Sequence, residues 1–155
     1  MINNIKNLLI ENLGTSNEQI HLFRAPARIN VIGEHVDYLG GFVLPAAIDF
    51  QVCVSIRKNA LGKIRLYSEQ YKEQANCDKP LYDKSHLWSN YVYGVVDELQ
   101  KEGFVIGGFD MAIDGNIPQG AGLSSSAALE VVTGYALSQL FELKISREKI
   151  ITPIL

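Results

Sequence analysis

The chain has 155 residues, about the size of one ordinary domain, and a globular composition with 47% hydrophobic and 20% charged residues. Its formal net charge is −3 and no run of Lys or Arg exceeds a pair, which argues against a nucleic-acid-binding or anionic-membrane surface. Two cysteines without CxxC spacing, and no apolar run near the roughly 20 residues of a membrane span, predict a cytoplasmic protein.

The first half of the sequence predicts one helix followed by strands. Apolar residues at helical spacing are closed by Gly14, which indicates a short amphipathic helix; they are Ile2, Ile5, Leu8, Leu9 and Leu13. Branched and aromatic residues with partial alternation then predict strands at HLFRAP, RINVIG, FVLPAAIDF with QVCVSIR, and KIRLYSE. We expect this half to form an antiparallel sheet.

The second half alternates helix and strand. Residues 90–102 place apolar side chains on one helical face, and residues 107–113 resemble a strand. DGNIPQGAGLSSSAALEVVTGYALSQLFEL then passes from turn residues into a long helix, predicted to begin among the serines and to end near Phe141. SREKII predicts a last short helix, capped by Ser146 and terminated by Pro153. The pattern is that of one α+β domain.

The loop at residues 118–127 has the features of an anion site. Gly120 and Gly122 let the backbone approach a ligand closely, and the helix start behind them presents unpaired N–H groups. The hydroxyls that follow could cap the helix, donate to phosphate oxygens or ligate Mg²⁺. An ordinary helix cap after a glycine turn remains the alternative at this point.

Two other phosphate-binding motifs fit this loop poorly. A Walker A loop requires a lysine after its second glycine, and no lysine stands there. The dinucleotide fingerprint GxGxxG finds Ser125 in place of its third glycine, and Glu142 is expected at a helix end and not at a strand end.

The stretch GEHVD at residues 33–37 puts two carboxylates and an imidazole close together. A metal site is disfavoured because the three histidines are scattered along the chain and no HExxH motif occurs. Carboxylates accept hydrogen bonds from two hydroxyls at once, so Glu34, His35 and Asp37 suit the vicinal hydroxyls of a sugar. A solvated polar turn is the alternative.

Taken together, the two stretches resemble a known family. APARINVIGEHVDYLGGFVLPAAIDF is similar to the galactokinase signature, and IPQGAGLSSSAALEV resembles the phosphate loop of the GHMP kinases, the superfamily to which galactokinases belong. The resemblance runs from about residue 23 to about residue 143. It implies an α+β fold of the ribosomal protein S5 domain 2-like type found in N-terminal domains of GHMP kinases, a mixed sheet with packed helices. The sugar signature would occupy residues 23–50, and the phosphate loop and helix residues 115–143.

The resemblance also implies roles for individual residues. Arg28 would stabilise charge during phosphoryl transfer. Ser68 would lie near the nucleotide; Trp88 and Tyr91 would flank the adenine, or else serve only to pack their helix. Sugar contacts are implied for Glu34, His35, Val36 and Asp37, and contacts to the ATP phosphates for Gly120, Ala121, Gly122, Leu123, Ser124, Ser125 and Ser126, with Ser126 also a Mg²⁺ ligand.

The implied activity is ATP-dependent phosphorylation of the C1 hydroxyl of galactose to galactose 1-phosphate, with ATP and Mg²⁺ as cofactors. The full-length enzyme would be a monomer. The alternatives are a noncatalytic galactose- and ATP-binding module, or a kinase for a related sugar such as N-acetylgalactosamine.

The sequence departs from the family pattern in two places. Ala27 replaces the glycine that usually precedes the arginine, a change that an extended backbone would tolerate. In the family a catalytic aspartate and a Mg²⁺-binding glutamate follow the phosphate helix, whereas after Glu130 the only acids here are Glu142 and Glu148. We therefore expect an N-terminal part without its C-terminal domain, inactive alone and prone to self-association.

Overall fold

One mixed sheet organises the residues that the computed structural model describes, which are 2–33, 40–118 and 123–151. The order of strands across the sheet is β1-β2-β5-β3-β4; β3 and β5 run parallel, and the other neighbouring pairs are antiparallel. The strands are β1 His21–Ile32, β2 Leu44–Lys58, β3 Ile64–Ser68, β4 Glu73–Cys77 and β5 Phe109–Gly115.

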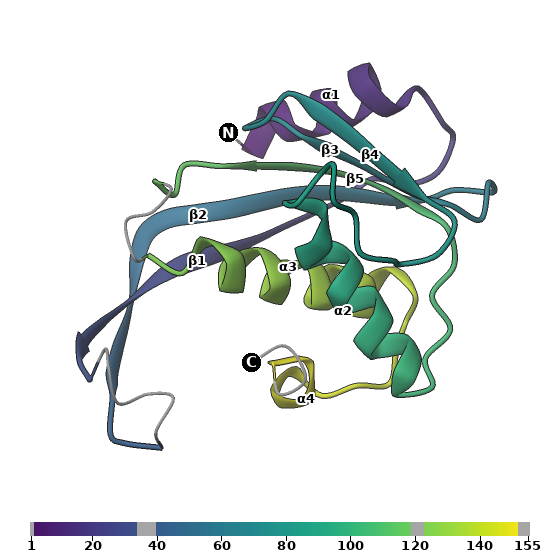
Figure 1. The fold of residues 1–155 in the computed structure, drawn as a ribbon. Helices are drawn as coiled ribbons and strands as arrows, with labels where there is room; N and C mark the ends of the chain where they lie inside the picture. The colour runs from purple at the N-terminus through teal and green to yellow at the C-terminus, as the bar shows by residue number, and fades with distance from the viewer. Residues whose placement is uncertain (1, 34–39, 119–122, 152–155) are drawn as a thin grey trace.

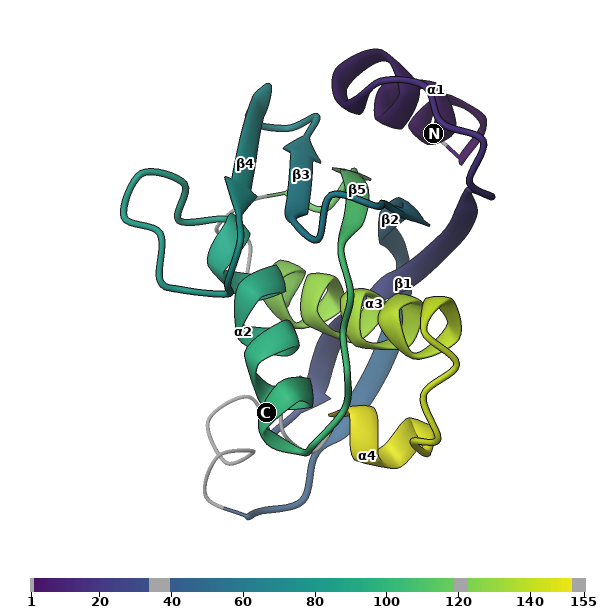
Figure 2. The ribbon, with the colours of Figure 1, turned by 90° about the vertical axis from the view of Figure 1, so that its right-hand side faces the viewer.

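Helices cover both faces of this sheet. Figure 1 shows α1 on one face, and α2 and α3 on the other, with α4 beyond α3; Figure 2 shows the same layers from the side. The helices are α1 Ile2–Leu13, α2 Ser89–Lys101, α3 Ser125–Leu140 and α4 Arg147–Ile151. The predicted fold class, an α+β domain with a mixed sheet and packed helices, is confirmed.

The helix predictions were close to the observed bounds. Apolar residues of α1 are buried on one face and Gly14 follows it with φ of 86°, as a helix end requires. The third helix begins at Ser125, among the serines, and ends one residue before Phe141. Ser146 caps α4, since its hydroxyl oxygen accepts a hydrogen bond from the Lys149 N–H at 3.3 Å. Pro153 lies outside the described residues.

Two strands predicted as separate are one. The prediction of a break at Pro26 was wrong, because β1 continues through it with a shift of register between Pro26 and Ala27. A proline is tolerated there because β1 is an edge strand and the shift removes the need for its missing N–H. Ala27 is fully buried within this extended strand. The backbone is therefore extended where alanine replaces the glycine usual in the family.

The strands of the first half pair in antiparallel fashion as expected, β1 with β2 and β3 with β4, but the two pairs are not adjacent. Strand β5, which follows α2 in the chain, inserts between β2 and β3 and pairs with β3 in parallel. A parallel neighbour needs a long crossover, here through β4 and α2, and no local pattern reveals it. Strand β4 was not predicted at all, because its sequence EQANC lacks apolar alternation.

The apolar core lies between the sheet and helices α2 and α3. Its fully buried members include Ile56, Leu66, Phe109, Val96 and Leu137. A smaller cluster lies on the opposite face, where Ile5, Leu8, Leu9 and Leu13 of α1 pack on Cys53, Tyr67 and Ala112. The two clusters hold the sheet rigid from both sides.

A buried ion pair attaches the end of α1 to the sheet. The Arg57 and Asp110 side chains are each 1% exposed and lie 2.8 Å apart. Arg57 also donates to the carbonyl oxygens of Leu13 at 3.2 Å and Gly14 at 2.7 Å, and Arg65 donates to the same Leu13 oxygen at 3.0 Å. The carbonyl of Leu13, the last residue of the helix, and that of Gly14 after it are thus satisfied by arginines.

Candidate active site

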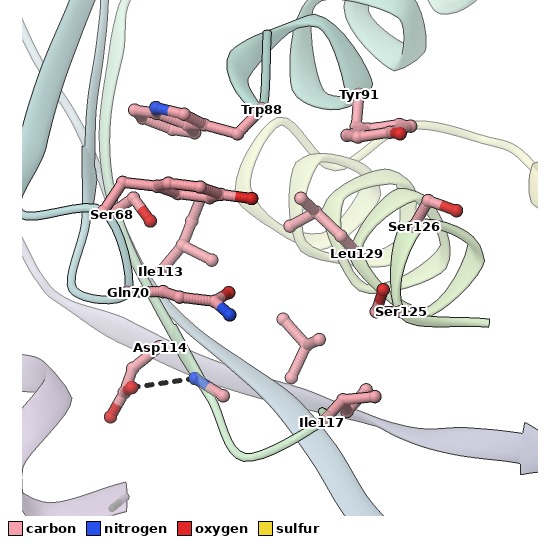
Figure 3. Close-up of a pocket in the computed structure, with 13 residues that line it drawn as sticks. Ser68, Gln70, Trp88, Tyr91, Ile113, Asp114, Ile117, Ser125, Ser126 and Leu129 are labelled. Carbon is pink, nitrogen blue, oxygen red and sulfur yellow. Dashed lines mark hydrogen bonds between the residues drawn. The ribbon is translucent and has the colours of Figure 1, made fainter. Parts of the chain in front are cut away.

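A cavity of about 310 Å³ opens between the β3–β4 turn, the start of α2, the end of β5 and the start of α3 (Figure 3). Chemically distinct side chains line it. The apolar ones are Val52, Ile113, Ile117 and Leu129; the aromatic ones are Tyr71, Trp88 and Tyr91; the polar ones are Ser68, Gln70, Asp114, Ser125 and Ser126. This mixture suits a ligand with a flat apolar part and a polar part.

Helix α3 begins at the edge of this cavity. Its N-cap is Ser124, which adopts the left-handed conformation with φ of 55° and makes no side-chain capping hydrogen bond. The first N–H groups of a helix have no acceptor within the helix, and the helix dipole adds a partial positive charge there. The sequence left open an ordinary helix cap by a serine side chain, and the structure shows no such cap at Ser124. The helix start can instead receive an anion.

Two of the predicted phosphate-binding residues reach the cavity. Ser125 and Ser126, in the first turn of α3, both line it, and Figure 3 shows them on the side opposite Ser68 and Gln70. Leu123 is partly buried against the core and does not line the cavity. Gly120, Ala121 and Gly122 lie outside the described residues.

The aromatic residues at the start of α2 contribute both to the core and to the wall of the cavity. Trp88 is 7% exposed, belongs to the core cluster and also lines the cavity. Its ring stacks on Tyr71, with centroids 6.2 Å apart and planes inclined by 10°. Tyr91 lines the cavity and is 43% exposed. The start of α2 thus contributes Trp88 to the core and both aromatic residues to the wall of the cavity.

Ser68 lies where the sequence placed it, at the end of β3, and it is buried and lines the cavity. The turn that follows it is tied to the sheet, because the Glu69 N–H donates to the Ile113 carbonyl at 2.9 Å. The Glu69 carboxylate accepts hydrogen bonds from Lys72 and from the Tyr67 hydroxyl, and these bonds, that of Lys72 first, hold its pKa below the usual value.

Sequence reasoning missed several residues of this cavity. Gln70 and Tyr71 stand in the turn EQYK, which has no glycine, proline or motif to mark it. Asp114 is at the end of β5, where its carboxylate accepts a hydrogen bond from the Gly115 N–H at 2.8 Å. These residues meet the predicted ones only because β5 lies beside β3, so no local pattern could have found them.

The predicted sugar-binding residues Glu34, His35, Val36 and Asp37 lie outside the described residues. The described flanks show that this segment connects β1 and β2, whose ends pair at Ile32 and Leu44. Gly33 has φ of 98°, and a Cβ there would stand 2.7 Å from the Phe42 carbonyl oxygen. A glycine is therefore required at the start of the segment.

Arg28 lies near the end of β1, opposite Ala47 of β2. It is exposed and does not line the cavity. Within the described part of the chain its guanidinium makes no hydrogen bond or ion pair.

Family models match two separate parts of the chain. The galactokinase galactose-binding signature matches residues 10–58, and the GHMP kinase N-terminal domain matches residues 90–153. Among solved structures, the galactokinase of Lactococcus lactis complexed with galactose is 36% identical, with a TM-score of 0.89 over 98% of this chain. The chain belongs to the galactokinase family of the GHMP kinases.

More distant kinases share the fold alone. The mevalonate kinase of Methanococcus jannaschii is 18% identical over 90% of this chain, with a TM-score of 0.73. A D-glycero-D-manno-heptose 1-phosphate kinase from Bacteroides thetaiotaomicron is 18% identical over 85%, with a TM-score of 0.70. This galactokinase-family chain spans 40% of the lactococcal enzyme, 46% of the mevalonate kinase and 45% of the heptose phosphate kinase.

The described part of this galactokinase-family chain lacks two features, a membrane-spanning helix and a cluster of metal-binding side chains. None of the helices in the described ranges is both long enough and apolar enough to cross a membrane. Within the same ranges, no three His, Cys, Asp or Glu residues gather as a metal site.

Proposed function

We propose that the chain forms the N-terminal part of a galactokinase, an enzyme of the cytoplasm that transfers the γ-phosphoryl group of ATP to the C1 hydroxyl of galactose. The observation that carries this proposal is the match to the galactose-binding signature, because its residues 10–58 contain the whole GEHVD stretch. The lactococcal relative was solved with galactose, and it matches 98% of this chain.

The cavity supports a nucleotide site beside the sugar signature. Its two serines lie at the start of α3, where phosphates would gain N–H donors and a favourable dipole. Its aromatic residues lie at the start of α2 and in the β3–β4 turn, where a base would find flat apolar surfaces. We assign Ser68, Ser125 and Ser126 to nucleotide binding on this basis.

We assign Ser126 as a magnesium ligand in this arrangement. The Ser126 hydroxyl is an oxygen ligand of the kind that Mg²⁺ takes together with substrate phosphates and water. When bound, the ion would neutralise negative charge on the phosphates. The segment at residues 120–126 would hold the phosphates through its backbone N–H groups.

In the proposed reaction the galactose O1 attacks the γ-phosphorus, the bond from that phosphorus to the β,γ-bridging oxygen breaks, and ADP leaves. Glu34, His35, Val36 and Asp37 would orient the sugar so that O1 lies in line with the breaking bond. The exposed guanidinium of Arg28 would stabilise the charge on the transferring group. The proton of O1 needs an acceptor, which we do not assign to this chain.

A chimera tests the proposal. Residues 1–155 are joined to the remaining part of the lactococcal galactokinase, and ATP-dependent formation of galactose 1-phosphate is measured. We expect activity in the chimera, its loss on Arg28→Ala, and none from residues 1–155 alone. The intact lactococcal enzyme is the positive control. A chimera that melts cooperatively yet makes no galactose 1-phosphate would contradict the proposal.

A binding measurement on the chain itself complements the chimera. Trp88 is the only tryptophan of the chain and lines the cavity, so its fluorescence reports on occupancy. We expect MgATP to change this fluorescence in a saturable manner. A Trp88 signal that stays constant up to millimolar MgATP would count against a nucleotide site in this cavity.

A further inference from the structure

We propose that the turn between β3 and β4 is the base-recognition element of the cavity, with Tyr71 as the stacking surface and Gln70 as the residue that selects adenine. This assignment rests on the proposed function, since it requires that the cavity bind a nucleotide. The assignment goes beyond the proposed function by naming the residues that recognise the base.

The charge and polarity of the cavity set the direction in which a nucleotide would lie. The hydroxyls of Ser125 and Ser126 and the uncapped helix start are at one side. The β3–β4 turn, from which the Gln70 side chain enters the cavity, is at the other (Figure 3). The helix start attracts phosphates through its partial positive charge and its N–H donors. The phosphates therefore belong at α3 and the base at the turn.

Trp88 by itself offers little surface to a base. It is 7% exposed, its indole N–H donates to Glu73 at 3.1 Å, and Tyr71 stacks on its ring. Tyr71 is the accessible member of this pair, because 45% of it is exposed. A base that enters the cavity would thus stack on Tyr71, with Trp88 holding that ring from behind.

Gln70 brings a carboxamide to the cavity. Figure 3 shows its carboxamide directed from the turn into the cavity. Within the described part of the chain this carboxamide makes no hydrogen bond, and the residue is exposed. A carboxamide carries an acceptor oxygen beside donor N–H groups, which match N6 and N7 of adenine. Guanine presents two acceptors on the same edge, so only one of them could be paired.

The turn is built rigidly enough to position both side chains. The Glu69 N–H is bonded to the Ile113 carbonyl at 2.9 Å, and the Glu69 carboxylate holds Lys72 and the Tyr67 hydroxyl. Lys72 adopts a left-handed conformation with φ of 55°, which these bonds must maintain. Residues 70 and 71 are therefore presented from a fixed frame, as specific recognition requires.

The test compares binding of MgATP, MgGTP and magnesium tripolyphosphate to the chain by calorimetry. A neutral hydrogen bond contributes modestly, so Gln70→Ala should weaken MgATP by about 3- to 10-fold and leave MgGTP and tripolyphosphate nearly unchanged. Loss of base stacking in Tyr71→Ala should weaken both nucleotides by roughly 10-fold, but not tripolyphosphate. Tyr71→Phe keeps the ring and should bind as the wild type does.

Two variants serve as matched controls. Gln100 is exposed on α2 and Tyr82 is 71% exposed in the β4–α2 loop, and neither lines this cavity. Gln100→Ala and Tyr82→Ala should leave all three affinities unchanged. Thermal melting of each variant establishes that it is folded.

The outcomes separate this assignment from the proposed function. A wild-type chain that binds neither MgATP nor tripolyphosphate would overturn the proposed function and this assignment with it. Wild-type binding of MgATP that survives unchanged in Gln70→Ala and Tyr71→Ala would overturn this assignment alone. If Gln70→Ala and Tyr71→Ala weakened tripolyphosphate binding as much as MgATP binding, this assignment would also be overturned.

Discussion

The indole N–H of Trp88 donates a hydrogen bond to a carboxylate oxygen of Glu73 at 3.1 Å and so joins the start of α2 to the edge strand β4. The same indole ring stacks on Tyr71 and lines the cavity. An exposed residue of a strand that carries no sequence motif thereby holds one wall of the candidate active site in place.

Removing the Glu73 carboxylate should loosen that wall. Glu73→Ala leaves the indole N–H of a nearly buried Trp88 without its acceptor, and we expect the free energy of unfolding to fall by about 1 to 2 kcal/mol. Urea denaturation followed by circular dichroism measures the change. Glu73→Gln retains an acceptor oxygen and should lose less. Equal stability of the alanine and glutamine variants would show that the hydrogen bond contributes nothing.

Removing Asp110 should be far more damaging. Its carboxylate is 1% exposed and pairs with Arg57, and it also accepts hydrogen bonds from Arg65. Asp110→Ala would leave the buried Arg57 without its counter-charge, and we expect a loss of about 3 to 5 kcal/mol in unfolding free energy.

The exposed pair Lys63–Asp78 provides the comparison for this prediction. Asp78→Ala removes the acid of an ion pair in solvent and should cost about 0 to 1 kcal/mol in the same denaturation experiment. If Asp110→Ala were as mild as Asp78→Ala, the buried pair would not be what attaches α1 to the sheet.

A half-buried carboxyl on α3 should make stability depend on pH. Burial raises the pKa of Glu130 above the usual glutamate value of 4.5, and within the described residues its carboxylate has no hydrogen-bond or ion-pair partner. As pH rises from 4.5 through the raised pKa, the unfolded chain gives up its proton first, so stability falls over that window and stays lower above it.

Glu130→Gln removes this titration. We expect the variant to melt at a higher temperature than the wild type at pH 7, with the difference vanishing as the pH is lowered to the usual carboxyl range. Differential scanning calorimetry at several pH values measures it. Glu11→Gln, on the exposed side of α1, is the matched control and should show no such trend. A constant difference for Glu130→Gln at all pH values would refute the proton linkage.

Sugar and phosphate contacts should be separable by substitution if the proposed function holds. Asp37→Ala and Glu34→Ala remove acceptors for sugar hydroxyls, so each should weaken galactose by about 1 to 3 kcal/mol and leave MgATP nearly unaffected. Ser126→Ala should weaken MgATP and spare galactose. Calorimetric titration of each variant with each ligand measures the split. Equal losses for both ligands in all three variants would contradict separate sites.

Local patterns predicted those parts of the molecule that depend on neighbours in sequence. The spacing of Leu8, Leu9 and Leu13 predicted α1, because a helix repeats every 3.6 residues and buries one face. The serines after Gly122 marked the start of α3 for the same reason. The pattern at Ser68 predicted the end of β3, and the structure places that serine in the cavity.

The sequence by itself determined the family and the residue types available for phosphate and sugar binding, because both motifs are contiguous stretches of chain. Tertiary structure alone decided that β5 enters between β2 and β3, and that Ser68, Gln70 and Trp88 therefore share one cavity with Ser125. Strand order is set by burial of the apolar faces of all five strands against α2 and α3 together. The free energy gained by this burial depends on the assembled sheet and cannot be assigned to any one segment of it.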